Sequence, residues 1–133
     1  MMKDKLLITF KKIIWDHYKK SGRHKMLWRQ TNDPYKIFVS EIMLQQTQVQ
    51  LVEEKFPEFI LTFPTVESLA NASLGEVLHV WQGLGYNRRA KYLKLAAELI
   101  MKNFDGKFPR SILELTTLPS IGNATASSIL TYA

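Results

Sequence analysis

Apolar residues recur at helical spacing along almost the whole chain, and no segment alternates apolar and polar residues as a half-buried strand does. Signals that start a helix stand between these stretches. Asp33-Pro34 combines an N-cap side chain with a proline suited to the first helical position. Residues 73–76 and 111–114 each have the Ser-x-x-Glu pattern of a capping box. The sequence therefore predicts an all-α fold.

The same signals bound the individual helices. We expect helices over residues 4–20, 35–46, 49–60, 65–70, 77–82, 86–103 and 124–133, with a short helix after Ser111. Pro57 predicts a bend or break within 49–60, because proline removes a backbone donor. The stretch 35–46 is apolar on several sides, so we expect it in the middle of the domain.

A length of 133 residues suits one compact domain. We expect a single helical domain over 1–133, with an N-terminal helix within 1–22 and a core over 23–133. The last helical stretch reaches Ala133 without a glycine or a polar cap, which predicts a core that is incomplete at its C-terminal end. Apolar faces left uncovered there favour marginal stability or self-association.

The composition excludes several kinds of site. The chain has no cysteine, so it forms no disulfide and supplies no thiol nucleophile and no cysteine-ligated zinc or iron–sulfur centre. The histidines, His17, His24 and His79, are not spaced as a metal-binding pair. No apolar run is long enough for a signal peptide or a membrane span. We therefore expect a cytoplasmic protein without a cofactor in this chain, located at the nucleoid if it is bacterial.

The chain is basic, with 18 Lys and Arg against 12 Asp and Glu and a formal net charge of +6. A basic protein attracts polyanions. Many basic proteins nevertheless bind nothing acidic, so charge alone does not decide for nucleic acid as the partner.

Glu41 is an acidic residue within the most apolar helix of the chain, and Gln45 and Gln46 follow near the end of that helix. One interpretation is an ion pair between Glu41 and an arginine such as Arg29, with the glutamines on a solvated helix end. The other is chemical. A carboxyl in apolar surroundings keeps its proton because desolvation penalises the charged form, and it can then act as a general acid toward a basic nitrogen. Glutamine amides can bind base edges without repelling phosphates.

These residues belong to a series of motifs. In chain order the motifs are Trp28-Arg29, Asp33-Pro34-Tyr35, Ser40-Glu41-Ile42-Met43-Leu44-Gln45-Gln46-Thr47-Gln48-Val49, Phe63-Pro64-Thr65, Trp81, Gly83-Leu84-Gly85-Tyr86, Lys107-Phe108-Pro109 and Leu118-Pro119-Ser120-Ile121-Gly122-Asn123-Ala124-Thr125-Ala126. With them the chain resembles the A/G-mismatch-specific adenine DNA glycosylases, the MutY family. The match covers nearly everything after residue 23, and its Met-Leu-Gln-Gln-Thr run separates this family from endonuclease III-type relatives.

The resemblance implies a helix-hairpin-helix glycosylase fold, base flipping and a role in base-excision DNA repair. The enzymes of this family hydrolyse the N-glycosidic bond of adenine mispaired with 8-oxoguanine or guanine in double-stranded DNA. By resemblance, Glu41 protonates N7 of the flipped adenine, which makes the base a better leaving group. Trp28, Arg29 and Leu44 are expected to line the adenine pocket.

Further residues are expected, by resemblance, to bind DNA. Gln46 and Tyr86 would enter the base stack near the lesion, where an inserted side chain offsets part of the cost of unstacking. Gln45 would also contact DNA, and the basic side chains of Arg88 and Arg89 would reach phosphates. Without the resemblance, Tyr86 is better explained as a packed core aromatic, and Arg88 and Arg89 as residues of a solvated helix face.

Residues 118–122 resemble the hairpin of a helix-hairpin-helix motif, whose backbone N–H groups hold a phosphate. Ser120, Gly122 and Thr125 are the expected contacts, and the alternative is an ordinary helix–helix turn. The family usually has glycine where Ser120 stands, which predicts an altered turn.

Ala124 stands where related glycosylase/lyases place a Schiff-base lysine, and alanine cannot form an imine. The resemblance therefore implies a monofunctional hydrolase.

The resemblance also implies parts that these 133 residues do not include: a catalytic aspartate beyond the hairpin, four cysteines for an iron–sulfur cluster and a C-terminal domain that inspects 8-oxoguanine. We therefore expect this truncated chain alone to excise adenine very weakly or not at all. Two alternatives stay open, a non-catalytic DNA-binding remnant of such an enzyme and a basic helical scaffold for a protein partner. Excision of adenine would distinguish the enzyme from the DNA-binding remnant. A preference for mismatched DNA would distinguish both of them from the protein scaffold.

Overall fold

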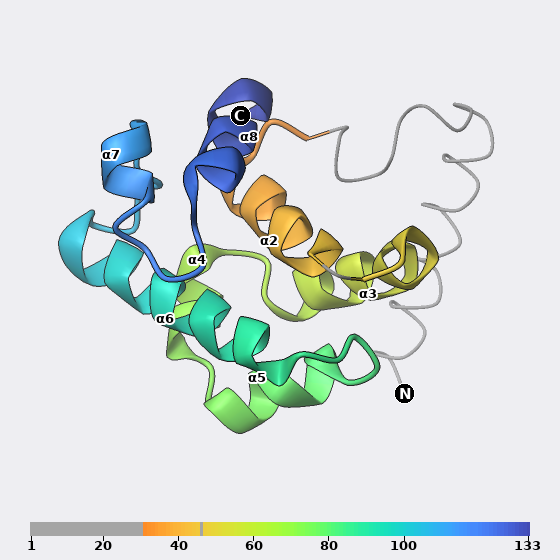
Figure 1. Ribbon diagram of the computed structural model, residues 1–133. Coiled ribbons are helices and arrows are strands. Elements are labelled where there is room, and N and C mark those ends of the chain that lie inside the picture. The colour runs from red at the N-terminus through yellow and green to blue at the C-terminus, as the bar shows by residue number, and fades with distance from the viewer. Residues whose placement is uncertain (1–30, 46) are drawn as a thin grey trace.

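The computed structural model describes residues 31–45 and 47–133. These residues form the helices α2 (Pro34–Leu44), α3 (Val49–Thr62), α4 (Val66–Asn71), α5 (Leu74–Trp81), α6 (Asn87–Asn103), α7 (Ile112–Leu115) and α8 (Asn123–Tyr132), and they include no strand (Figure 1). The all-α prediction is confirmed for this part of the chain. The helix expected over 4–20 lies outside the described residues. In the described part, no helix combines the length and the apolar character needed to cross a membrane.

α2 is the central helix of the fold. It packs against α3, α6 and α8, and Figure 1 shows it between α3 and α8. Asp33 caps the helix, because its side chain accepts a hydrogen bond from Tyr35 N at 3.0 Å, and Pro34 begins the first turn. Ile37 and Ile42 are fully buried. The central position predicted from the apolar faces of this helix is confirmed.

α3 continues through Pro57. Of the bend or break expected at this proline, the break is therefore wrong, and the bend stays a prediction. A proline inside a helix removes one hydrogen bond and costs about 3 kcal/mol. Phe56, Phe59 and Ile60 of the same helix are buried in the core, and full burial of such a side chain contributes about 1.5–3 kcal/mol. Phe59 also packs edge-on against Trp81 of α5, with ring centroids 6.1 Å apart. Core packing therefore outweighs the local preference of Pro57.

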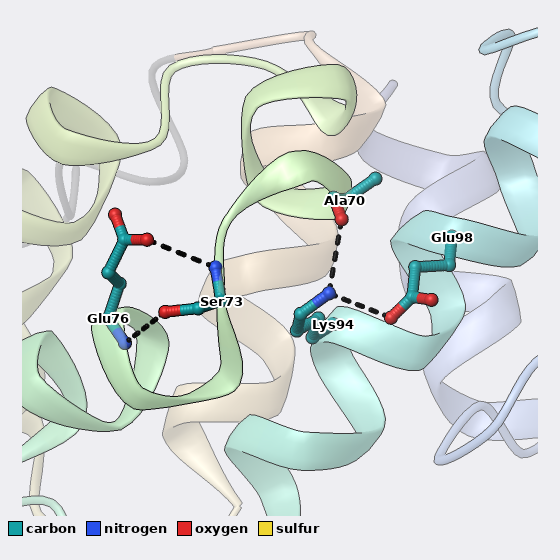
Figure 2. Close-up of polar contacts among 5 residues, drawn as sticks. All are labelled: Ala70, Ser73, Glu76, Lys94 and Glu98. Carbon is teal, nitrogen blue, oxygen red and sulfur yellow. Dashed lines mark hydrogen bonds and ion pairs between the residues drawn. The ribbon is translucent and has the colours of Figure 1, made fainter.

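Polar contacts fix the ends of α4 and α5 (Figure 2). At the start of α5, the Ser73 hydroxyl accepts a hydrogen bond from Glu76 N at 3.1 Å, and the Glu76 carboxylate accepts one from Ser73 N at 3.2 Å. This is the predicted capping box. At the end of α4, Lys94 of α6 donates to the carbonyl oxygen of Ala70 at 3.1 Å and to Glu98 at 2.8 Å. Lys94 thereby ties α4 to α6.

The chain turns sharply after α6 and enters the last two helices. Asp105 and Gly106 follow α6 in left-handed conformations, with φ of 53° and 76°. At the start of α7, the Ser111 hydroxyl accepts a hydrogen bond from Glu114 N at 3.1 Å, as predicted. This hydroxyl also donates to the Glu114 carboxylate at 3.0 Å. In a full capping box that carboxylate accepts a hydrogen bond from the backbone N–H of the capping residue, so the capping box predicted over residues 111–114 forms only in part. α8 then packs on α2.

Candidate functional site

The end of α2 and the turn before α6 form the walls of an open cleft of about 770 Å³. Its described lining residues are Gln45, Tyr86, Asn87, Arg88 and Arg89. Gln45, Tyr86 and Arg88 are among the residues predicted from the sequence to bind DNA. The structure therefore brings these three residues together from two distant parts of the chain.

The turn of residues 83–86 holds Tyr86 outward at the cleft. Tyr86 is the N-cap residue of α6 and has a left-handed backbone with φ of 51°, a conformation that is uncommon for a bulky residue. The residue is 62% exposed, so the alternative of a packed core aromatic is wrong. Trp81 is fully buried, and its indole Nε1 donates to the carbonyl oxygen of Gly85 at 3.0 Å. An exposed ring on a turn fixed in this way can stack on a base.

Arg88 and Arg89 have opposite environments. Arg88 is exposed, whereas Arg89 is only 8% exposed. Burial lowers the pKa of Arg89 below its ordinary value, and the nearby Tyr86 opposes this shift. The Arg89 guanidinium carbon lies 5.4 Å from the centroid of the Tyr86 ring and 5.5 Å from that of Trp81, within the range of a cation–π contact. The interpretation of both arginines as one solvated face is therefore wrong for Arg89. The expectation that Arg89 reaches a phosphate is wrong as well, because its guanidinium is buried and donates to oxygen atoms of the protein.

Sequence reasoning missed the burial of Arg89, although the helical spacing contains a signal for it. Arg89 lies four residues before Leu93 and extends the buried stripe of α6 that continues through Ala96 and Ile100. An arginine on an apolar stripe needs hydrogen-bond acceptors within the fold. The acceptors of Arg89 include carbonyl groups at the end of α2, which no local pattern identifies.

Glu41 lies on α2 one turn before the cleft. Leu44 follows it by three residues and so lies on the same side of the helix, while Gln45 caps the helix end. The Glu41 side chain is half-buried and its Oε1 atom is fully buried, so the carboxyl does not point into open water. Leu44 packs against the hydrophobic core. The Glu41 carboxyl is thus partly removed from solvent.

The connector between α7 and α8 is a tight hairpin. Ile121 N donates to Leu118 O at 3.3 Å, and both side chains are buried. Ser120 has φ of 68°, so the turn keeps a conformation that favours glycine although serine occupies it. Gly122 is exposed and has no side chain to cap α8, which leaves N–H groups of the first helical turn available to an external anion. Thr125 is half-buried in that first turn.

The hairpin and Glu41 belong to one packed unit, because α8 packs directly on α2. Trp28, Arg29 and Gln46 lie outside the described residues, so their roles, and the alternative ion pair between Glu41 and Arg29, stay predictions.

No group of three or more His, Cys, Asp or Glu is placed to hold a metal ion in the described ranges. Since the chain has no cysteine, none of its residues fits the ligand set of a cysteine-bound iron–sulfur cluster.

Comparison with known proteins identifies the family. Residues 39–127 match the HhH-GPD superfamily of base excision DNA repair proteins. The chain belongs to this superfamily. The matched HhH-GPD region contains Glu41, the cleft residues and the hairpin, so it includes every candidate residue that the structure describes.

Among HhH-GPD proteins, the chain is similar to adenine DNA glycosylases. It is 39% identical over 125 residues to the adenine DNA glycosylase of Buchnera aphidicola subsp. Baizongia pistaciae, a match that covers 94% of this chain and 36% of the relative. It is 40% identical over 124 residues to that of Buchnera aphidicola subsp. Acyrthosiphon pisum, covering 93% of this chain and 35% of the relative. The chain thus spans about a third of the length of these relatives. The resemblance carried by the motifs is confirmed.

A solved structure shares the HhH-GPD fold. The structure of a thermostable thymine-DNA glycosylase matches with a TM-score of 0.79 and 26% sequence identity, and the match covers 99% of this chain and 59% of that chain. The predicted helix-hairpin-helix glycosylase fold is therefore confirmed.

Proposed function

We propose that this protein is an adenine DNA glycosylase that hydrolyses the N-glycosidic bond of adenine mispaired with 8-oxoguanine or guanine in duplex DNA. The observation that carries the proposal is the placement of Glu41. This residue has a buried carboxylate oxygen and lies one helical turn before a cleft lined by Gln45 and Tyr86. The similarity to adenine DNA glycosylases supports adenine as the base that is removed.

Glu41 is the proton donor in this proposal. Once adenine is extruded from the duplex, the carboxyl of Glu41 gives its proton to N7 of the base. The bond between C1′ and N9 then breaks, its electron pair stays on the protonated base, and the sugar becomes oxocarbenium-like. Water adds to C1′ and releases a proton to solvent. Ala124 offers no amine for an imine, so the reaction ends at hydrolysis.

Leu44 provides an apolar wall of the adenine pocket, and Trp28 and Arg29 complete the pocket. A flat apolar wall favours the ring of a purine, while a guanidinium can donate to a base edge.

The cleft and the hairpin bind the duplex at separate places. Tyr86 and Gln46 enter the base stack beside the extruded adenine, and the amide of Gln45 contacts base edges. The exposed Arg88 binds a phosphate. The hairpin, through Ser120, Gly122 and Thr125, binds a second phosphate with backbone N–H groups at the start of α8.

The proposal is tested by the release of free adenine under single-turnover conditions. The substrate is a duplex with one adenine opposite 8-oxoguanine, and the control is the same duplex with that adenine opposite thymine. We expect the natural protein to release adenine from the mispaired duplex only. Release from neither duplex contradicts the proposed activity.

The polypeptide of residues 1–133, tested alone, is expected to release adenine very slowly or not at all. Residues 123–133 contain no aspartate that could stabilise the cationic sugar, and protonation of the base supplies only part of the catalysis. Adenine release at the rate of a complete adenine DNA glycosylase contradicts this expectation. If the natural protein binds the mispaired duplex preferentially but releases no adenine, the protein is a DNA-binding remnant.

A further inference from the structure

Arg89 lies between the two walls of the cleft and binds oxygen atoms of both. On the α2 side, its guanidinium donates to the carbonyl oxygens of Ile42 at 2.8 Å, Met43 at 3.1 Å and Gln45, and to the hydroxyl of Thr47 at 2.7 Å. The last carbonyls of a helix lack the usual partner four residues further along and carry partial negative charge, although the Ile42 carbonyl also accepts a hydrogen bond from Gln45 N at 3.3 Å. Arg89 therefore satisfies these carbonyls and neutralises the helix end that faces the cleft.

The same guanidinium also reaches the turn that holds Tyr86. Its Nη2 atom lies 3.4 Å from the carbonyl oxygens of Leu84 and Gly85. The Gly85 carbonyl is also the acceptor of the Trp81 indole. Arg89 thus shares an acceptor with the core residue that supports the turn, and its guanidinium lies under the Tyr86 ring at 5.4 Å.

The geometry of these contacts requires arginine. A guanidinium is planar and directs its donors along several fixed lines, so it can bridge two segments, whereas a lysine ammonium is a single point of charge. Each of the acceptors named above is a neutral oxygen. The contacts of Arg89 with the two walls therefore depend on the directions of its donors as well as on its charge.

We propose that Arg89 is a positioning residue that holds Gln45 and Thr47, which follow α2, and the Tyr86 turn at a fixed separation. With this separation fixed, both segments enter a distorted duplex together, and the protein prefers a mispaired site over a fully paired one. The inference rests on the proposed function, because it assigns the two cleft walls to the insertion step.

The test compares Arg89→Lys with Arg110→Lys, which makes the same exchange at an exposed arginine outside the cleft. For each protein, affinity is measured for a duplex with adenine opposite 8-oxoguanine and for the fully paired duplex of the same sequence. The affinity ratio is the affinity for the mispaired duplex divided by the affinity for the fully paired duplex. Measured on one preparation, this ratio does not depend on the fraction of folded protein. We expect Arg89→Lys to lower this ratio by about tenfold or more, since small misplacements of binding groups have large effects. Arg110→Lys leaves the ratio unchanged.

A second pair of variants keeps the test valid if Arg89→Lys fails to fold. Thr47→Val removes one hydroxyl acceptor of Arg89, and Thr47→Ser keeps it. We expect Thr47→Val to lower the affinity ratio by about threefold and Thr47→Ser to preserve it. Unchanged ratios in Arg89→Lys and in Thr47→Val overturn the positioning role of Arg89. A ratio near one in the unmodified natural protein instead overturns the proposed function itself, and with it the inference.

Discussion

The indole N–H of Trp81 donates a hydrogen bond to the carbonyl oxygen of Gly85 at 3.0 Å, and this bond connects the hydrophobic core to the turn that presents Tyr86. The Trp81 ring is fully buried and packs against Phe59 of α3. The cleft is therefore supported from the hydrophobic core. Its two walls are joined further by Arg89.

Trp81→Phe is expected to lower the free energy of unfolding by about 1–3 kcal/mol, because it removes a buried hydrogen bond and leaves a small cavity. It should also reduce the preference for a mispaired duplex, since the turn loses a support. Ile100→Val is the control, because it costs about 1 kcal/mol in the core without touching the turn. Chemical denaturation and duplex binding measure the two effects. Equal duplex preference in both variants would count against the support role of Trp81.

Ser120→Gly is expected to stabilise the protein by about 0.5–1 kcal/mol, because Ser120 has φ of 68° and glycine adopts this conformation without steric cost. Ser127→Gly makes the same exchange at an exposed position inside α8. It should destabilise the protein by about 0.5 kcal/mol, since glycine is a poor helix former. Thermal denaturation measures the change in stability of each variant, which should be positive for Ser120→Gly and negative for Ser127→Gly. Destabilisation by Ser120→Gly would show that its hydroxyl contributes more than the strain costs.

Arg88→Ala is expected to weaken binding to mispaired and fully paired duplexes by the same factor, because a phosphate contact carries no sequence information. The slope of log affinity against log salt concentration should become shallower by about 1. Arg110→Ala, at an exposed arginine away from the cleft, serves as the control for net charge. An identical salt slope in Arg88→Ala and the unmodified protein would remove Arg88 from the phosphate contacts.

The buried hydroxyl of Tyr35 leads us to expect that the protein loses stability at alkaline pH. Its hydroxyl donates to the Phe63 carbonyl oxygen at 2.6 Å; burial first and Asp33 second raise its pKa well above the ordinary value. Above about pH 10 the unfolded chain releases this proton and the folded chain keeps it, so the free energy of unfolding falls by about 1.4 kcal/mol per pH unit. Below that pH both states are protonated and the full stability is present. Denaturation measured between pH 8 and 11 should show a smaller fall in the free energy of unfolding for Tyr35→Phe than for the unmodified protein. Equal slopes of the free energy of unfolding against pH in the two proteins would contradict the assignment of this loss to Tyr35.

The parts of the fold that local chemistry determines could be predicted from the sequence. The cap at Asp33 and the capping box at Ser73 depend on residues within one helical turn, and both form as expected. Pro57 and Arg89 could not be predicted in the same way. The helix across Pro57 is held by the burial of its neighbours in the core, and Arg89 is held by carbonyls more than forty positions earlier in the chain.

The candidate site shows the same division. The apolar helix around Glu41 predicts a partly desolvated carboxyl, and the structure places its Oε1 atom out of solvent. The exposure of Tyr86 could not be read from the spacing, because the left-handed backbone at this residue directs the side chain out of the helical stripe.

The central claim is that the carboxyl of Glu41 protonates the extruded adenine. The most direct measurement is the single-turnover rate of adenine release by Glu41→Gln in the natural protein, with Glu54→Gln, at an exposed glutamate of α3, as the matched control. Glutamine keeps the size of the side chain but has no acidic proton. We expect a fall of at least about 100-fold in Glu41→Gln and no change in Glu54→Gln, with binding to the mispaired duplex retained by both. A rate in Glu41→Gln equal to that of the unmodified protein would contradict the proposed role of Glu41.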